Sequence, residues 1–272
     1  MKLTKLFSGF SLAEGPLYDS RNERLYFVDI NKGNLHFIKE EGLYTFYIGE
    51  YLSAVFLTTV EEVVLLAVKD TIYSFDFRTK EKELLYKIEF DNSMRFNDGK
   101  VSPSGEIFIG TMGINKDRTE TGKLYKITKE GIKEFDRSFT IPNGLDWQDG
   151  NFYHIDTTKH QIFKYKEINE TLKEEEVITL SGVNPDGMTI SSSKKAYVAV
   201  WGSGRVFILD LAKCVVPNVI EVDESKNVSS VIIGGREMNT LYITSAEDEN
   251  YSGAIYKLEI EDKGVESNLW KI

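Results

Sequence analysis

The sequence is poor in the residues that form disulfides and thiolate- or histidine-based metal centres. Its 272 residues include one cysteine, Cys214, and three histidines, His36, His154 and His160. A single cysteine cannot form a disulfide within the chain, and it excludes a metal site built from several thiolates. No H-E-x-x-H motif is present to suggest a zinc protease. Any metal ion is therefore expected to bind mainly to oxygen.

Long apolar runs and an excess of basic charge are also missing. No stretch approaches the roughly 18–20 apolar residues of a membrane-spanning helix, and the first residues lack the apolar core of a signal peptide. The chain carries 43 acidic and 33 basic side chains, for a formal net charge of −10. Such a field repels phosphate. We therefore expect a cytoplasmic protein that binds neither nucleic acid nor membrane and whose charged partners are cations.

What the sequence does contain is a β-strand pattern repeated six times. Each copy reads x-aliphatic-ring-x-apolar, two β-rich runs precede it, and a more polar strand follows it. The copies are 34–38, 71–75, 123–127, 161–165, 205–209 and 254–258. No segment keeps a helical apolar period for more than about two turns. The pattern predicts an all-β fold, a six-bladed β-propeller with four-stranded antiparallel blades around a central channel, which forms one domain over residues 1–272. A β-sandwich is the alternative.

In such a propeller the first strand of every blade lines the channel, and all six run in the same direction. Their starting residues therefore meet at one mouth. The residues at that level are Glu14, Ser53, Asn97, Asn143, Asp186 and Ser229. Carboxylates together with amide carbonyls form an oxygen site that suits Ca²⁺, Mg²⁺ or Mn²⁺. We therefore predict a metal site at this mouth.

Glycines beside these residues have two interpretations. Glu14, Asn143 and Asp186 are each followed directly by glycine, which fits backbones that crowd near an axis. Asn-Gly and Asp-Gly are also common turn dipeptides. The turns after the first strands are supplied further on, at 148–150 and 192–194. This position favours the axial interpretation.

Several of these segments resemble a known family. In their order and spacing they are similar to the SMP-30/gluconolactonase/LRE family, over about residues 13–246. The segments are Ala13-Glu14-Gly15-Pro16, Arg95-Phe96-Asn97-Asp98-Gly99-Lys100, Asn143-Gly144-Leu145-Asp146-Trp147 and Pro185-Asp186-Gly187-Met188. The resemblance implies a six-bladed propeller with one axial divalent metal ion that hydrolyses a sugar lactone such as gluconolactone. Calcium is the first expectation, with zinc, magnesium and manganese as alternatives.

The resemblance also implies a role for individual residues. Glu14, Asn143 and Asp186 would bind the metal, Arg95 and Asn97 would hold the substrate, and Asp186 would match the proton donor and acceptor. Asn115 stands where some members carry a glutamate that contacts the sugar. We therefore expect Asn115 to bind substrate, on a loop at 113–122 that covers the mouth and affects the choice of lactone.

The residues support this chemistry on their own terms. Two carboxylates and one amide leave Ca²⁺ or Mg²⁺ short of its usual six or so ligands, so water and a substrate oxygen can complete the shell. Asp186 would accept a proton from the attacking water or orient that water, and Trp201 would form either a wall of the pocket or part of the core. No serine-hydrolase elbow or glycine-rich phosphate loop is present. The alternatives are a calcium-dependent phosphotriesterase and a non-catalytic calcium-binding regulatory protein.

Overall fold

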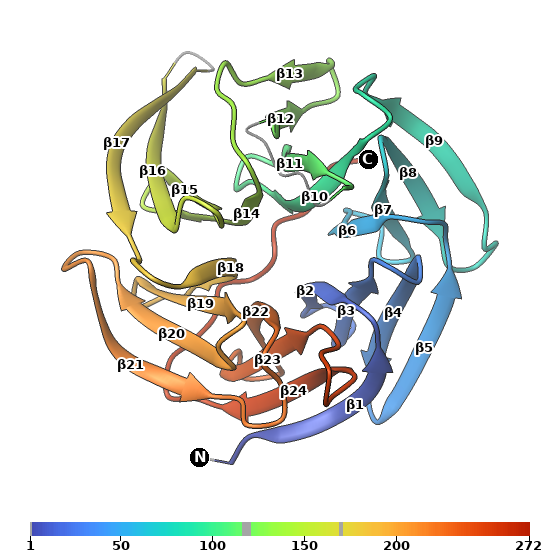
Figure 1. Cartoon of the computed structure of the whole chain (residues 1–272). Coiled ribbons are helices and arrows are strands. Elements are labelled where there is room, and N and C mark those ends of the chain that lie inside the picture. Colours follow the sequence, from blue (N-terminus) through green and yellow to red (C-terminus); the bar gives the residue numbers. More distant parts are fainter. Residues whose placement is uncertain (1, 116–120, 169–170) are drawn as a thin grey trace.

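The computed structural model describes residues 2–115, 121–168 and 171–272. Over these residues the chain is built from β-strands and turns, and 24 strands form six four-stranded antiparallel sheets. The sheets stand as blades in a ring around a central axis (Figure 1). This arrangement is a six-bladed β-propeller, which confirms the predicted fold. The described residues contain no helix that is long and apolar enough to cross a membrane.

Blades 1 to 3 follow one another along the chain, and each runs from its inner strand to its outer strand. Blade 1 comprises β2 (Ala13–Asp19), β3 (Arg24–Asp29), β4 (Asn34–Lys39) and β5 (Gly42–Tyr47). Blade 2 comprises β6 (Leu52–Leu57), β7 (Val63–Val68), β8 (Thr71–Asp76) and β9 (Lys82–Lys87). Blade 3 comprises β10 (Met94–Val101), β11 (Ile107–Gly113), β12 (Leu124–Ile127) and β13 (Ile132–Glu134).

Blades 4 and 5 repeat this order, whereas blade 6 takes a strand from the other end of the chain. Blade 4 comprises β14 (Pro142–Gln148), β15 (Asn151–Asp156), β16 (Gln161–Ile168) and β17 (Thr171–Thr179). Blade 5 comprises β18 (Asn184–Ile190), β19 (Lys195–Trp201), β20 (Arg205–Asp210) and β21 (Val215–Glu221). Blade 6 comprises β22 (Val228–Gly234), β23 (Thr240–Ser245), β24 (Gly253–Glu259) and the N-terminal β1 (Thr4–Phe10).

The hydrophobic core lies between the blades. In the described chain, buried side chains form six clusters, each shared by two neighbouring blades. Middle strands therefore bury both faces: in β7, Leu65 packs toward blade 3 and Leu66 packs toward blade 1. A strand covered on both faces reads as a continuous apolar run, because polar residues have no solvated face to occupy. This explains the apolar sequence Val63-Val64-Leu65-Leu66-Ala67 in β7.

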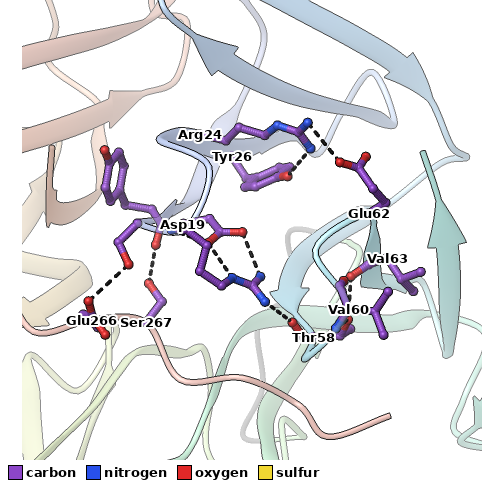
Figure 2. Close-up of polar contacts among 12 residues, drawn as sticks. Asp19, Arg24, Tyr26, Thr58, Val60, Glu62, Val63, Glu266 and Ser267 are labelled. Carbon is purple, nitrogen blue, oxygen red and sulfur yellow. Dashed lines mark hydrogen bonds and ion pairs between the residues drawn. The ribbon is translucent and has the colours of Figure 1, made fainter. Parts of the chain in front are cut away.

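The C-terminal segment, residues 260–272, crosses one end of the channel. It passes through the middle of the ring from blade 6 to blade 2 (Figure 1). Ser267 Oγ donates to Tyr18 O at 2.7 Å, and Trp270 N donates to Leu57 O at 2.8 Å. Figure 2 shows the Ser267 contact beside Asp19 and Thr58. Tyr18 and Leu57 lie near the ends of the inner strands β2 and β6. The segment therefore covers the mouth opposite the starts of these strands.

Candidate active site at the other mouth of the channel

The inner strands share an irregularity at the level where the candidate residues occur. Each strand loses its regular register with the next strand of its blade, as in a β-bulge. A bulge bends the strand locally and re-aims a side chain. The irregularities fall between Glu14 and Leu17, Leu52 and Ala54, Phe96 and Gly99, Asn143 and Leu145, Pro185 and Met188, and Val228 and Ser230.

Two glycines in these bulges let neighbouring blades approach closely. Gly144 has a φ of +34°, and a Cβ there would lie 2.6 Å from the main-chain oxygen of Asp186. A Cβ on Gly187 would lie 2.0 Å from Ser230 Oγ. Both distances are too short for a real side chain, so only glycine fits without displacement. The dipeptides Asn143-Gly144 and Asp186-Gly187 thus belong to inner strands and not to hairpin turns.

A cavity of about 260 Å³ opens at this mouth and collects five of the predicted residues. They come from four blades: Glu14 from β2, Arg95 and Asn97 from β10, Asn143 from β14, and Asp186 from β18. The remaining lining is apolar on some sides and polar on others. It consists of Leu12, Ile30, Met112, Ile141, Thr157, Thr158, Asn184 and Trp201. Trp201 therefore borders the cavity.

Three other predicted positions are placed differently. The hydroxyls of Ser53 and Ser229 are buried and donate to main-chain carbonyls, Ser53 to Phe96 O and Ser229 to Ala13 O. Asn115 is exposed just beyond β11, and it is not among the described residues that line the cavity. Residues 116–120 of the predicted covering loop lie outside the described residues. The role of Asn115 in substrate binding therefore stays a prediction.

A hydrogen-bond network fixes the amides of the site. Arg95 Nη1 donates to Asn97 Oδ1 at 3.0 Å, and Asn97 Nδ2 donates to Asn143 Oδ1 at 2.7 Å. Asn143 Nδ2 in turn donates to Thr157 Oγ1 at 2.8 Å. Asn97 and Asn143 are each less than a tenth exposed. Buried amides with assigned partners have one orientation, so this network holds the donor and acceptor pattern of the cavity.

Two carboxyl groups, Glu14 at the cavity and Asp98 in the neighbouring part of the channel, are costly to ionise. Burial and, to a smaller extent, the charge of Asp98 raise the pKa of Glu14 to about 8, although the Gly15 amide and Arg95 oppose the rise. Burial likewise raises the pKa of Asp98 to about 6. By surface area both side chains are half-buried: Glu14 lines the cavity, and Asp98 lines a second cavity along the channel. A cation at this mouth would relieve the cost of both charges.

Lys100 and Asp146 neutralise each other deeper in the channel. Lys100 Nζ lies 2.7 Å from Asp146 Oδ2, and the same carboxylate oxygen accepts from Ile190 N at 2.7 Å. Asp146 is therefore held by blades 3 and 5 at once. For Glu14 and Asp98, by contrast, burial carries a clear electrostatic cost.

Two buried aspartates hold the loops that lead into the cavity. Asp29 accepts from the amides of Ser11 and Leu12, and Asp156 accepts from the amides of Thr140 and Ile141. Leu12 and Ile141 are cavity residues. In blades 1 and 4, a carboxylate at the end of the second strand thus holds the residues just before the inner strand, which form part of the cavity wall.

Sequence reasoning missed Thr157, Thr158 and Asn184 as cavity residues. Thr157 and Thr158 directly follow β15, and Asn184 begins β18. Inner strands and the ends of second strands meet at the same mouth because neighbouring strands of a blade are antiparallel. The sequence could have shown these residues, because the predicted topology places the residues after each second strand at the same mouth, where polar side chains could have been sought.

The donor chemistry of the cavity fits a hard divalent cation. Glu14, Asp186 and Asn143 offer two carboxylates and one amide oxygen, the ligand types that Ca²⁺ and Mg²⁺ prefer. Among the described residues, no three His, Cys, Asp or Glu side chains group in a way that could hold a metal. A metal site here therefore depends on the amide as well as on the two carboxylates.

Comparison with known proteins agrees with this architecture. Residues 12–247 match the family model described as an SMP-30/Gluconolactonase/LRE-like region. An uncharacterized protein of Sulfolobus acidocaldarius is 36% identical over 94% of each chain. YvrE of Bacillus subtilis, named as a candidate sugar lactone lactonase, is 31% identical over 93% of this chain and 92% of its own. The structure of a calcium-binding protein, regucalcin, from Agrobacterium tumefaciens superposes with a TM-score of 0.90 at 24% identity, covering 98% of this chain and 97% of that one.

Proposed function

The chain belongs to the SMP-30/gluconolactonase/LRE-like family, and from that premise we propose that it opens the ring of a sugar lactone with a bound divalent metal ion. One observation carries the proposal. A single cavity brings Glu14, Asn143 and Asp186 together with the polar side chains Arg95 and Asn97. The name of the Bacillus subtilis relative, which aligns over nearly its whole length, supports a sugar lactone as the substrate class.

Glu14, Asn143 and Asp186 are the proposed metal ligands. Calcium suits this set best, because it accepts carboxylate and amide oxygens in flexible geometry, and magnesium, manganese and zinc are the alternatives. When bound, such an ion supplies a Lewis acid that polarises the carbonyl of an ester. A bound cation would also offset the electrostatic cost of ionising Glu14 and Asp98.

Arg95 and Asn97 are the proposed substrate-binding residues. Arg95 is held by two hydrogen bonds from Nη1, to Phe96 O at 2.7 Å and to Asn97 Oδ1 at 3.0 Å. A guanidinium fixed in this way binds ring hydroxyls or the negative charge that develops on the lactone. The cavity volume of about 260 Å³ lies just below the usual range for drug-sized ligand pockets, which suits a single small ring.

Asp186 is the proposed proton acceptor. Its side chain is buried at the cavity, where it can take a proton from the attacking water and return one to the leaving oxygen of the ring. A metal ligand is a weak base because the cation lowers its pKa, so orienting the water is the second role that Asp186 can have. The two roles give different results in the variant discussed below.

The proposal is tested by an assay of sugar lactones after chelation and after metal return. We expect hydrolysis of a gluconolactone or pentonolactone that is lost in EDTA and restored by Ca²⁺ or another divalent ion. A phosphotriester such as paraoxon is assayed beside it. Full lactone turnover without metal contradicts the mechanism, and turnover of only the phosphotriester contradicts the substrate. Calcium binding with no turnover of either supports a non-catalytic binding protein instead.

A further inference from the structure

Four hydrogen bonds between blades share a target in the main chain. Each donor is a buried side chain of one blade, and each acceptor is the carbonyl oxygen of the residue just before a cavity side chain of the next blade. The bonds are Ser53 Oγ to Phe96 O at 2.7 Å, Asn97 Nδ2 to Pro142 O at 2.9 Å, Thr157 Oγ1 to Pro185 O at 2.8 Å, and Ser229 Oγ to Ala13 O at 2.6 Å. The residues that follow the acceptors are Asn97, Asn143, Asp186 and Glu14.

These carbonyls lie where the β-ladder holds the chain least well. The register of the inner strand breaks directly after Phe96 and Pro185, and one residue beyond Ala13 and Pro142, so regular pairing with the second strand ends within one residue of each carbonyl. Pro142 and Pro185 also have no N–H to donate. A hydrogen bond from the neighbouring blade therefore helps to set the direction of the following side chain, and at Phe96 O it acts together with the hydrogen bond from Arg95 Nη1.

Thr157 combines two of these contacts. Its hydroxyl donates to Pro185 O, the carbonyl before Asp186, and accepts from Asn143 Nδ2. A single hydroxyl thus links the side chain of one proposed metal ligand to the backbone of another. A hydroxyl has one proton and two lone pairs, so it can meet both demands at once. Valine has the same shape but can meet neither.

We propose that Ser53, Thr157 and Ser229 are positioning residues. Each acts through its hydroxyl on the peptide before one cavity residue: Ser53 before Asn97, Thr157 before Asp186, and Ser229 before Glu14. The proposal rests on the function proposed above. Because each hydroxyl serves a different cavity residue, the three divide between two steps. Thr157 and Ser229 govern metal binding, and Ser53 governs substrate binding.

The test compares Thr157→Val with Thr157→Ser and with the matched control Thr58→Val. Thr58 is also a buried threonine, and its hydroxyl donates to Val60 O and Val63 O near the opposite mouth (Figure 2). Ca²⁺ affinity is measured by calorimetry without substrate. We expect Thr157→Val to weaken Ca²⁺ binding about tenfold, the lower end of the effect for groups that orient metal ligands. Thr157→Ser and Thr58→Val should bind Ca²⁺ as the parent protein does.

Ser53→Ala and Ser229→Ala separate the two routes. We expect Ser229→Ala to weaken Ca²⁺ binding, and Ser53→Ala to raise KM for the lactone several-fold while Ca²⁺ affinity is unchanged. A general loss of stability would change both quantities in both variants and in Thr58→Val. Equal effects of Ser53→Ala and Ser229→Ala on Ca²⁺ affinity would overturn the assignment.

A crystallographic readout distinguishes a failure of this inference from a failure of the proposed function. Metal-free structures of the parent protein and Thr157→Val are compared at Asn143 and Asp186. A rotated Asn143 amide or a displaced Asp186 carboxylate supports the positioning role, and superposable side chains overturn it. If the parent protein binds no divalent ion and opens no lactone, the proposed function fails, and this comparison still decides the positioning role.

Discussion

Asp186 lies where metal binding and proton transfer meet in the proposed mechanism. Asp186→Asn keeps an oxygen of nearly the same size but removes one negative charge and the capacity to accept a proton. We expect weaker metal binding, and at saturating Ca²⁺ a kcat that is still lower by about 10² or more, the scale for losing a general acid or base. Steady-state kinetics across a Ca²⁺ titration measures both effects. Full activity at saturating Ca²⁺ would mean that Asp186 only holds the ion.

Arg95→Ala is the contrasting variant for that experiment. A guanidinium cannot ligate a cation, so the variant should keep its Ca²⁺ affinity and lose substrate binding and transition-state stabilisation. If Arg95→Ala lost Ca²⁺ affinity as strongly as Asp186→Asn, the division of the cavity into metal and substrate residues would be wrong.

His154 gives the fold a pH dependence that is separate from the site. Its ring is fully buried beside Phe139 and Phe163, at centroid distances of 4.5 Å and 5.5 Å. Neither ring nitrogen has a hydrogen-bond partner in the described chain. Burial, with smaller contributions from Arg137 and Lys159, lowers the pKa of His154 from 6.5 to about 3. The folded protein therefore holds this imidazole neutral.

Between about pH 6.5 and pH 3, His154 is protonated in the unfolded chain but neutral in the folded chain. The stabilising effect is therefore complete above about pH 6.5 and is lost as the pH falls toward 3. Between pH 7 and pH 5 the free energy of unfolding falls by about 2 kcal/mol for this reason. In His154→Phe the free energy of unfolding should fall by about 2 kcal/mol less between pH 7 and pH 5 than in the parent protein. Urea unfolding in EDTA at both pH values measures this difference. An unchanged pH slope would show that His154 has the same pKa in the folded and the unfolded chain.

Residue chemistry made part of the site predictable. Glu14, Asn97, Asn143 and Asp186 stand at equivalent places in the repeat, so the repeat alone brings them to one mouth. Ser53 and Ser229 stand at the same level, yet their hydroxyls bond to the main chain of the next blade. The sequence could not distinguish these outcomes, because the contact between blades depends on bulge geometry that the strand pattern does not encode.

The prediction that a polar strand follows each copy of the pattern is wrong for residues 254–258, because the outer strand of blade 6 comes from residues 4–10. Residues 4–10 pair with β24, with Thr4 opposite Lys257 and Phe10 opposite Gly253. These segments are about as far apart as the chain allows, and β1 is mostly exposed, so its polar pattern has little to distinguish it. The other blades could be predicted because their strands are consecutive and their turns are short.

Removal of β1 should open the ring at blade 6. A chain that begins at Ser11 leaves the edge of β24 unpaired and loses the packing of Phe10 against Phe27, at a ring distance of 5.0 Å. We expect a lower Tm and self-association through the free edge, because unpaired strand edges recruit other strands. Light scattering and thermal unfolding measure these changes. A chain without residues 2–3 is the control, and an unchanged Tm in the Ser11 chain would show that β1 does not close the ring.

At the scale of the whole molecule, the two mouths of the channel have separate tasks. The starts of the inner strands carry the cavity, and the opposite ends are tied together by the C-terminal segment. Asn268 Nδ2 donates to Val101 O at 3.0 Å, and the Thr59 amide donates to Trp270 O at 2.9 Å. One segment thus joins blades 6, 1, 2 and 3 without reaching the site. Stability and activity should therefore respond to different substitutions.

Trp270 is the residue on which this separation can be tested. It is 4% exposed, belongs to the core cluster between blades 2 and 3, and meets Tyr86 edge-on at 6.1 Å. Trp270→Ala should lower the free energy of unfolding by roughly 3–5 kcal/mol, as for other large aromatic truncations in a core. Because the cavity lies at the other mouth, kcat and KM at 25 °C should stay within about twofold of the parent values.

Val265→Ala is the control in the same segment, because Val265 is 59% exposed and its truncation should change stability by less than about 0.5 kcal/mol. Denaturant unfolding gives the stabilities, and initial rates below the unfolding transition give the kinetics. A large loss of kcat in folded Trp270→Ala would show that the C-terminal segment is coupled to the site through the channel. An unfolding free energy equal to that of Val265→Ala would show that the segment does not brace the ring, since a buried tryptophan could then be removed without cost.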